Sequence, residues 1–103
     1  MRDILDQIAE PVTEVVGNEP YKYYPLGDYI VRAPGVCGGR PTFKYTRINV
    51  DFILNQITYG KSIQFIVDDF DDPHLTEEAI QEAMLLTTAA FNASPQVLTT
   101  LAA

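Results

Sequence analysis

The sequence predicts a mainly α-helical domain: a three-helix, helix–turn–helix or winged-helix-like unit with a small N-terminal β-hairpin. Apolar residues recur at helical spacing in three runs between residues 50 and 91, and helix breakers and capping residues separate these runs. Further upstream, two short runs rich in Tyr, Ile and Val flank the turn-forming sequence Pro25-Leu26-Gly27-Asp28. The chain has 103 residues, which suits one domain.

Tight connections join the three predicted helices. The first begins near Val50 and stops at Gly60, and Ser62 is the predicted N-cap of the second. Asp71-Asp72-Pro73 ends the second helix, and Thr76 is the predicted N-cap of the third. The spacing assigns five residues of the third helix to a buried stripe. They are Ile80, Ala83, Met84, Thr87 and Phe91.

The N-terminal part gives weaker signals. Residues 2–10 fit a short helix that Pro11 ends, and Val12 to Val16 fit a helix or a strand equally well. The hairpin is expected to pair residues 21–24 with residues 29–32, and Thr42 to Tyr45 form a third short strand. We therefore divide the chain into an N-terminal extension (1–28), a core (29–91) and a C-terminal tail (92–103).

Charge is distributed unevenly along the chain. The net charge is −7, and residues 63–103 carry seven acidic side chains without a Lys or Arg. Residues 29–50 carry four basic side chains and no acidic one. The one Cys excludes an internal disulfide, and no apolar run is long enough to span a bilayer, so we expect a cytoplasmic protein that does not bind membranes.

The basic block holds the best candidates for a functional site, namely Arg40, Lys44 and Arg47. Two interpretations of Arg47 remain open: it contacts phosphate, or it ties its loop to Asp51 or to helix C-terminal carbonyls. Gly38 and Gly39 form a tight turn that presents Arg40, or they cradle an anion with backbone N–H groups. Cys37 and His74, the only Cys and His, make no metal set, and we expect no cofactor and no catalysis.

The third predicted helix argues against ordinary operator binding. A recognition helix places its first residues at base edges in the major groove. Here those residues include Glu77, Glu78 and Glu82, with no compensating cation. Any DNA binding is therefore expected to be weak and to use the basic loop of residues 32–47.

Several sequence motifs follow one another in a fixed order along residues 29–91. They are Pro34-Gly35-Val36-Cys37-Gly38-Gly39-Arg40-Pro41, then Lys44, Thr46-Arg47-Ile48 and Val50, Gly60-Lys61-Ser62-Ile63, and Pro73-His74-Leu75-Thr76-Glu77-Glu78-Ala79-Ile80. In this order they resemble the bacterial family called domain of unknown function 433. Gly38, Gly39, Pro41 and Thr46 are the residues of the motif loop. This chain departs from the family pattern at three positions: Phe43 replaces Ile or Val, Tyr45 replaces Gly, and Asn49 replaces Pro.

The resemblance implies a helix–turn–helix-like fold and, for some relatives, an antitoxin that pairs with a PIN-type ribonuclease toxin. We therefore expect a non-enzymatic protein-interaction domain, antitoxin-like, with a PIN-type toxin or another protein as its partner. The alternative is a DNA-binding regulator that uses the loop of residues 32–47. Tyr45 puts in doubt any contact that the family's Gly makes, because Gly permits a tight bend or a close backbone approach.

Four apolar side chains fall outside the buried faces of the predicted helices: Phe52, Tyr59, Phe65 and Leu85. They suggest a second buried surface. Either the N-terminal 28 residues or a second copy of the chain could cover it. We expect a homodimer with these four residues at its interface.

Overall fold

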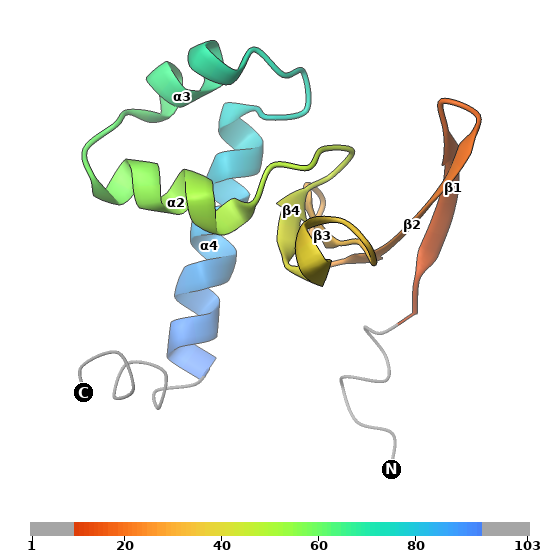
Figure 1. The fold of residues 1–103 in the computed structure, drawn as a ribbon. Coiled ribbons are helices and arrows are strands. Elements are labelled where there is room, and N and C mark those ends of the chain that lie inside the picture. Colours follow the sequence, from red (N-terminus) through yellow and green to blue (C-terminus); the bar gives the residue numbers. More distant parts are fainter. Residues whose placement is uncertain (1–9, 94–103) are drawn as a thin grey trace.

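A computed structural model of the chain describes residues 10–93. Four strands precede three α-helices along the chain (Figure 1). The elements are β1 (Val12–Val16), β2 (Glu19–Pro25), β3 (Ile30–Arg32), a 3₁₀ turn η1 (Cys37–Gly39), β4 (Pro41–Phe43), α2 (Val50–Thr58), α3 (Ile63–Phe70) and α4 (Glu77–Ala93).

The four strands form one antiparallel sheet in the order β1-β2-β3-β4. The prediction of a mainly α fold is therefore wrong, because a four-stranded sheet stands beside the three helices. The predicted hairpin is present as β2–β3, but only Tyr24 and Pro25 pair with β3, opposite Arg32 and Val31, while the earlier residues of β2 pair with β1. The third predicted strand is present as β4, which begins and ends earlier than expected.

The hairpin β1–β2 accounts for most of the difference. Gly17 and Asn18 have φ angles of +57° and +69°, which suit a two-residue turn with the twist of the flanking strands. Pro20 disguised β2 in the sequence, since proline lacks the N–H that a central strand donates. Pro20 lies opposite Val15, in the pair that follows the turn-closing pair Val16–Glu19. Hydrogen-bonded and non-hydrogen-bonded pairs alternate in an antiparallel ladder, so the Val15–Pro20 position requires no N–H from Pro20.

The three helices lie where the sequence predicts them, and their N-caps explain why. Ser62 Oγ accepts a hydrogen bond from Phe65 N at 3.0 Å, and Thr76 Oγ1 accepts one from Ala79 N at 3.2 Å. The capping predictions for Ser62 and Thr76 are therefore confirmed. Asn49 is a third cap, because its Oδ1 accepts from Asp51 N at 2.9 Å.

The core joins β3 and β4 to all three helices. Its central side chains are fully buried and come from a strand and from each helix: Phe43, Ile53, Ile66 and Ile80. A second, smaller cluster lies on the sheet and contains Tyr23, Val31 and Ala33. Strands β3 and β4 thus pack on the helices through the main core, and they position the loop between them.

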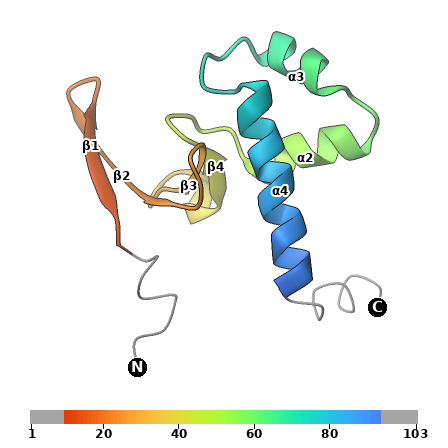
Figure 2. The ribbon, with the colours of Figure 1, turned by 180° about the vertical axis from the view of Figure 1, so that it is seen from behind.

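The buried face of α4 is shorter than predicted. Ala79, Ile80 and Ala83 are buried, whereas Met84 and Phe91 of the expected stripe are exposed. In both ribbon views the C-terminal half of α4 extends past the rest of the fold (Figures 1 and 2). Among residues 10–93, no sheet or helix therefore covers Met84 and Phe91.

One predicted helix falls outside the residues described: of the helix expected over residues 2–10, only Glu10 is described. Between residues 10 and 93, no helix combines the length and the apolar character that crossing a bilayer requires.

Candidate binding site

Arg40 stands at the end of a turn that has a left-handed backbone. Cys37, Gly38 and Gly39 have φ angles of +50°, +65° and +80°. The N–H groups of Gly39 and Arg40 donate to the carbonyls of Val36 and Cys37 at 2.9 and 3.2 Å. These two N–H groups are therefore occupied within the turn, which favours presentation of the Arg40 side chain over an anion cradle.

Thr46 fixes the loop that carries Arg47. Its buried hydroxyl donates to the carbonyl of Phe43 at 2.7 Å and accepts from Ile48 N at 3.0 Å. Cys37 Sγ donates to the carbonyl of Arg47 at 3.1 Å and so joins the two arginine-bearing loops. Thr46 and Cys37 thus act on the backbone and leave the Arg47 side chain exposed.

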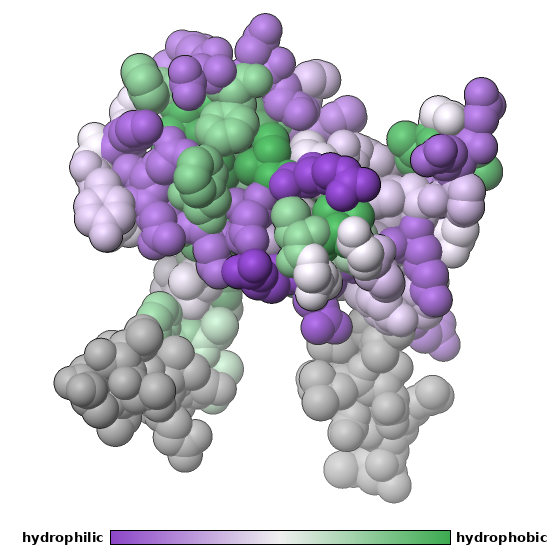
Figure 3. Space-filling view, in the orientation of Figure 1, coloured by the Kyte–Doolittle hydropathy of each residue, from purple (hydrophilic) through white to green (hydrophobic). Residues whose placement is uncertain are grey.

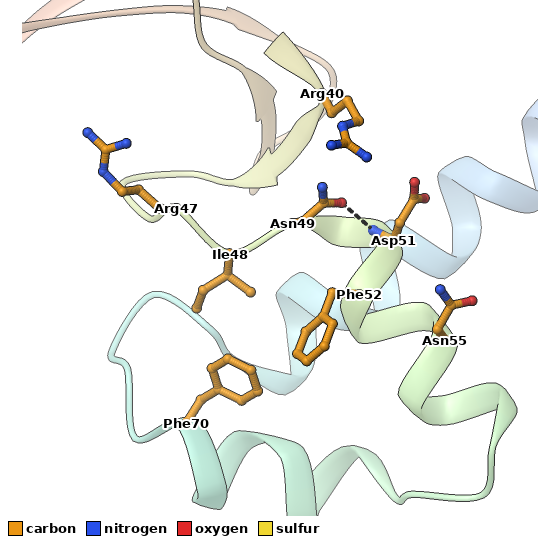
Figure 4. A pocket seen from close by; sticks show the side chains of 8 residues that line it. All are labelled: Arg40, Arg47, Ile48, Asn49, Asp51, Phe52, Asn55 and Phe70. Carbon is orange, nitrogen blue, oxygen red and sulfur yellow. Dashed lines mark hydrogen bonds between the residues drawn. The ribbon is translucent and has the colours of Figure 1, made fainter. Parts of the chain in front are cut away.

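Arg40 and Arg47 line one open hollow of about 510 Å³. Phe52 of α2 and Phe70 of α3 form its apolar wall, with ring centroids 6.2 Å apart in an edge-to-face arrangement (Figure 4). Neither arginine forms an ion pair within residues 10–93, so the predicted tie between Arg47 and Asp51 is not made. The remaining lining residues are polar or aliphatic: Ile48, Asn49, Asp51 and Asn55.

The space-filling view shows the setting of this hollow. Apolar side chains gather over α2 and α3, and strongly hydrophilic side chains border them (Figure 3). An apolar centre with a polar rim is the usual anatomy of a surface that binds another macromolecule.

Lys44, the third basic candidate, lies apart from the other two. Its Nζ is 3.8 Å from a Glu14 carboxylate oxygen, and it lies 5.0 Å and 5.1 Å from the ring centroids of Tyr23 and Tyr45. Lys44 also lines a different, smaller hollow with Tyr45 and His74. The sequence grouped three cations, and the structure keeps only Arg40 and Arg47 together.

Glu14 is the centre of the contacts around Lys44. Tyr23 OH donates to one of its carboxylate oxygens, and Tyr45 OH donates to the other at 2.8 Å. These hydrogen bonds, with a smaller contribution from the Lys44 charge, lower the pKa of Glu14 below its ordinary value. The same hydrogen bonds raise the pKa of the Tyr23 and Tyr45 hydroxyls, because they favour the protonated phenols.

Tyr45 occupies a position that suits glycine. Its φ angle is +67°, in the left-handed region that disfavours a bulky residue. Tyr45 N donates to Tyr21 OH at 3.1 Å, and the Tyr45 ring centroid lies 5.5 Å from that of Tyr21 and 5.1 Å from that of His74. Contacts with β1, β2 and the loop before α4 thus hold a side chain where the family pattern has none.

Glu82 performs a structural role that the sequence did not reveal. Its carboxylate accepts backbone hydrogen bonds from Asp28, Tyr29 and Ile30 at 2.9, 2.7 and 3.1 Å. Gly27 leaves room for it, since a Cβ there would lie 2.5 Å from a Glu82 oxygen. Glu82 therefore joins α4 to the turn between β2 and β3.

The four apolar residues predicted to lie at an interface are all exposed in the single chain: Phe52, Tyr59, Phe65 and Leu85. Strands β1 and β2 lie at the far end of the molecule from α2 and α3 in both ribbon views (Figures 1 and 2). The described part of the N-terminal extension is thus not their cover. Phe52 lines the hollow with Arg40 and Arg47, and the other three do not.

Comparison with known families identifies the chain's family. A family model described as Protein of unknown function (DUF433) matches residues 30–85, which is more than half of the chain. The chain belongs to the DUF433 family. No curated protein and no solved structure shows a significant match.

The DUF433 match covers the Arg40–Arg47 hollow in full but only part of the contacts around Glu14 and Tyr45. It includes Arg40, Arg47, Phe52 and Phe70, so the hollow lies wholly within it. The hairpin residues Glu14, Tyr21 and Tyr23 precede the match. Tyr45 therefore has partners on both sides of the boundary: Glu14 and Tyr21 precede the match, and His74 lies within it. Within residues 10–93, no group of three or more His, Cys, Asp or Glu side chains could hold a metal ion.

Proposed function

We propose that this chain is a non-enzymatic protein-interaction domain that binds its partner through the hollow of Arg40, Arg47, Phe52 and Phe70. The carrying observation is that two exposed arginines on adjacent loops, Arg40 and Arg47, border the same hollow as the exposed Phe52 ring. Arginine and aromatic residues supply a large share of the binding energy in protein interfaces.

The charge of the hollow indicates the chemistry of the partner. Neither arginine has a carboxylate partner within residues 10–93, and Asp51 is the only acidic residue of the hollow. Guanidinium groups bind carboxylates through paired hydrogen bonds, and Phe52 and Phe70 favour an apolar neighbour. The fitting surface carries acidic side chains beside an aliphatic or aromatic one.

The family resemblance supplies a specific candidate for that partner. It implies an antitoxin-like role in which the domain binds a PIN-type ribonuclease toxin. We therefore propose a PIN-type protein encoded beside this gene as the first partner to test.

Duplex DNA is the second candidate ligand, because unpaired arginines on two adjacent loops also suit phosphate oxygens. The rest of the molecule opposes this alternative. The net charge is −7, and Glu77 and Glu78 stand exposed in the first turn of α4.

The proposal predicts that a PIN-type protein is encoded beside this gene, and titration calorimetry of the domain with that protein tests it. We expect Arg40→Ala with Arg47→Ala, and separately Phe52→Ala, to weaken binding by about tenfold or more, as the loss of central interface contacts does. Lys22→Ala is the matched control, since Lys22 is an exposed cation on β2 outside the hollow.

The outcomes separate the two candidates. Protein binding that survives both hollow variants would place the interface elsewhere on the domain. Binding of a duplex probe that falls steeply with salt and is lost in the arginine double variant would support the DNA-binding alternative.

A further inference from the structure

The C-terminal half of α4 is an exposed helix without charge. Residues 84–93 include no Asp, Glu, Lys or Arg, and none of these residues is buried. Leu85 is 71% exposed, and Met84 and Phe91 are also exposed. This half-helix extends beyond the sheet and the other helices (Figures 1 and 2).

A helix with an apolar surface that faces water contributes little to the stability of the fold. Short helices without tertiary packing are marginally stable, and most helices in proteins depend on a packed apolar face. The first half of α4 has such a face in Ala79, Ile80 and Ala83. From the part of the chain that the structure describes, the second half has cover on one side only, where Leu86, Thr87 and Ala90 border an apolar groove of about 420 Å³.

The half-helix is more apolar than its sequence suggests. Thr87 Oγ1 donates to the carbonyl of Ala83 at 2.8 Å, and Thr88 Oγ1 donates to the carbonyl of Met84 at 3.0 Å. Both hydroxyl donors are thus satisfied within the helix. An exposed stripe next to the buried face consists of Met84, Thr88 and Phe91 at positions i, i+4 and i+7, with the small residue in the middle.

We propose that a second copy of the chain covers this half-helix, so that two α4 helices cross antiparallel about a two-fold axis near Thr88. The axis brings Met84 of each copy against Phe91 of the other, and a thioether packs well at an aromatic ring. The small Thr88 residues allow the helices to approach closely at the crossing.

Charge favours this surface over the other exposed apolar positions. Two copies that each carry −7 repel one another unless the contact surface is neutral. Phe52 shares its hollow with Arg40, Arg47 and Asp51, and Lys61 lies 5.5 Å from the Phe65 ring. Residues 84–93 instead offer ten consecutive uncharged positions.

The dimer is independent of the proposed partner site. None of the residues that line the Arg40–Arg47 hollow belongs to α4. Each copy can therefore present its hollow while α4 is paired, and a failure of either proposal leaves the other standing.

Light scattering after size exclusion tests the dimer on the full chain. We expect a mass of twice 11.5 kDa for the wild type. We expect Thr88→Glu to give the mass of a single chain, because the two-fold axis brings the two new carboxylates together. Glu is a better helix former than Thr, so this change preserves the helix.

Thr58→Glu on α2 is the matched control. Thr58 is also exposed, and its hydroxyl makes the same type of bond, to the carbonyl of Leu54 at 3.0 Å. We expect Thr58→Glu to remain dimeric. A wild-type mass of one chain at submillimolar concentration would overturn the proposal, as would a dimer that Thr88→Glu leaves intact.

Oxidative cross-linking adds a positional test. Thr88→Cys should give a disulfide-linked dimer, because the two sulfur atoms meet at the axis. Thr58→Cys should remain a monomer on the same gel. A covalent dimer of equal yield in both variants would contradict the placement of the axis.

Discussion

Tyr45 shows how one residue can depend on partners far away in the sequence. Its backbone adopts a conformation that glycine tolerates best, yet its hydroxyl binds Glu14, 31 residues earlier. Family likeness indicates that the position is unusual. It does not reveal Glu14, which precedes the family match.

The carboxylate of Glu14 predicts a pH effect on stability. Its pKa is lowered in the folded protein by hydrogen bonds from Tyr23 and Tyr45, so the charged form stabilises the fold. That contribution is fully present above the ordinary value of 4.5 and is lost as the pH falls through the lowered pKa. We expect the wild-type urea midpoint to decrease more than that of Glu14→Gln when the pH is lowered from about 6 to about 3. Equal decreases in the two proteins would contradict this role.

Ile80 tests the buried face of α4. Its side chain is fully buried in the main core, so Ile80→Ala should lower the free energy of unfolding by about 2–5 kcal/mol. Phe65→Ala, which removes a half-exposed ring on α3, should cost less. Urea denaturation of both variants checks the ranking, and a reversed order would mean that the core is wrongly assigned.

The helices could be predicted from the sequence because their signals are local. Ser62 and Thr76 cap the helices that follow them, and both lie within a few residues of the N–H groups that they bind. Strand β1 could not be predicted, because Val12 to Val16 become a strand only by pairing with β2. The candidate site also combines residues with local sequence signals and residues that only the tertiary packing brings in. The loops that carry Arg40 and Arg47 were found, whereas Phe70 joined them only through the packing of α3.

Glu82 and Gly27 predict coupled substitutions. Glu82→Ala leaves three backbone N–H groups without their acceptor and should cost about 1–2 kcal/mol, less than a buried loss because water reaches Asp28 and Tyr29. Gly27→Ala should also destabilise, since its Cβ would displace the carboxylate. In a double-mutant cycle by urea denaturation, Gly27→Ala should cost less once Glu82 is Ala. Strict additivity would contradict the contact.

The molecule as a whole combines a small basic hollow with a strongly acidic chain. Arg40 and Arg47 are exposed, whereas Lys44 forms an ion pair with Glu14. The Glu82 carboxylate accepts hydrogen bonds from the β2–β3 turn. The local positive charge is therefore limited to two guanidinium groups. This distribution favours a protein partner over the phosphate backbone of DNA.

Duplex DNA gives a direct test of that balance. We expect negligible binding of the purified protein at physiological salt, because the net charge is −7 and few cations are free to replace counterions. A gel shift across a salt series measures it. Submicromolar, sequence-specific binding that persists after Arg40→Ala with Arg47→Ala would contradict the expectation.

The contact between Glu82 and the β2–β3 turn also bears on how the fold opens. It joins residues 52 to 54 positions apart, so the turn amides are protected only while α4 is docked on the sheet. Exchange of the Asp28, Tyr29 and Ile30 amide hydrogens with solvent deuterium therefore reports the undocking of a helix that follows them by half the chain. Strand β1, which pairs only with β2, has no such dependence on α4, and its amides should exchange through local fraying of the hairpin.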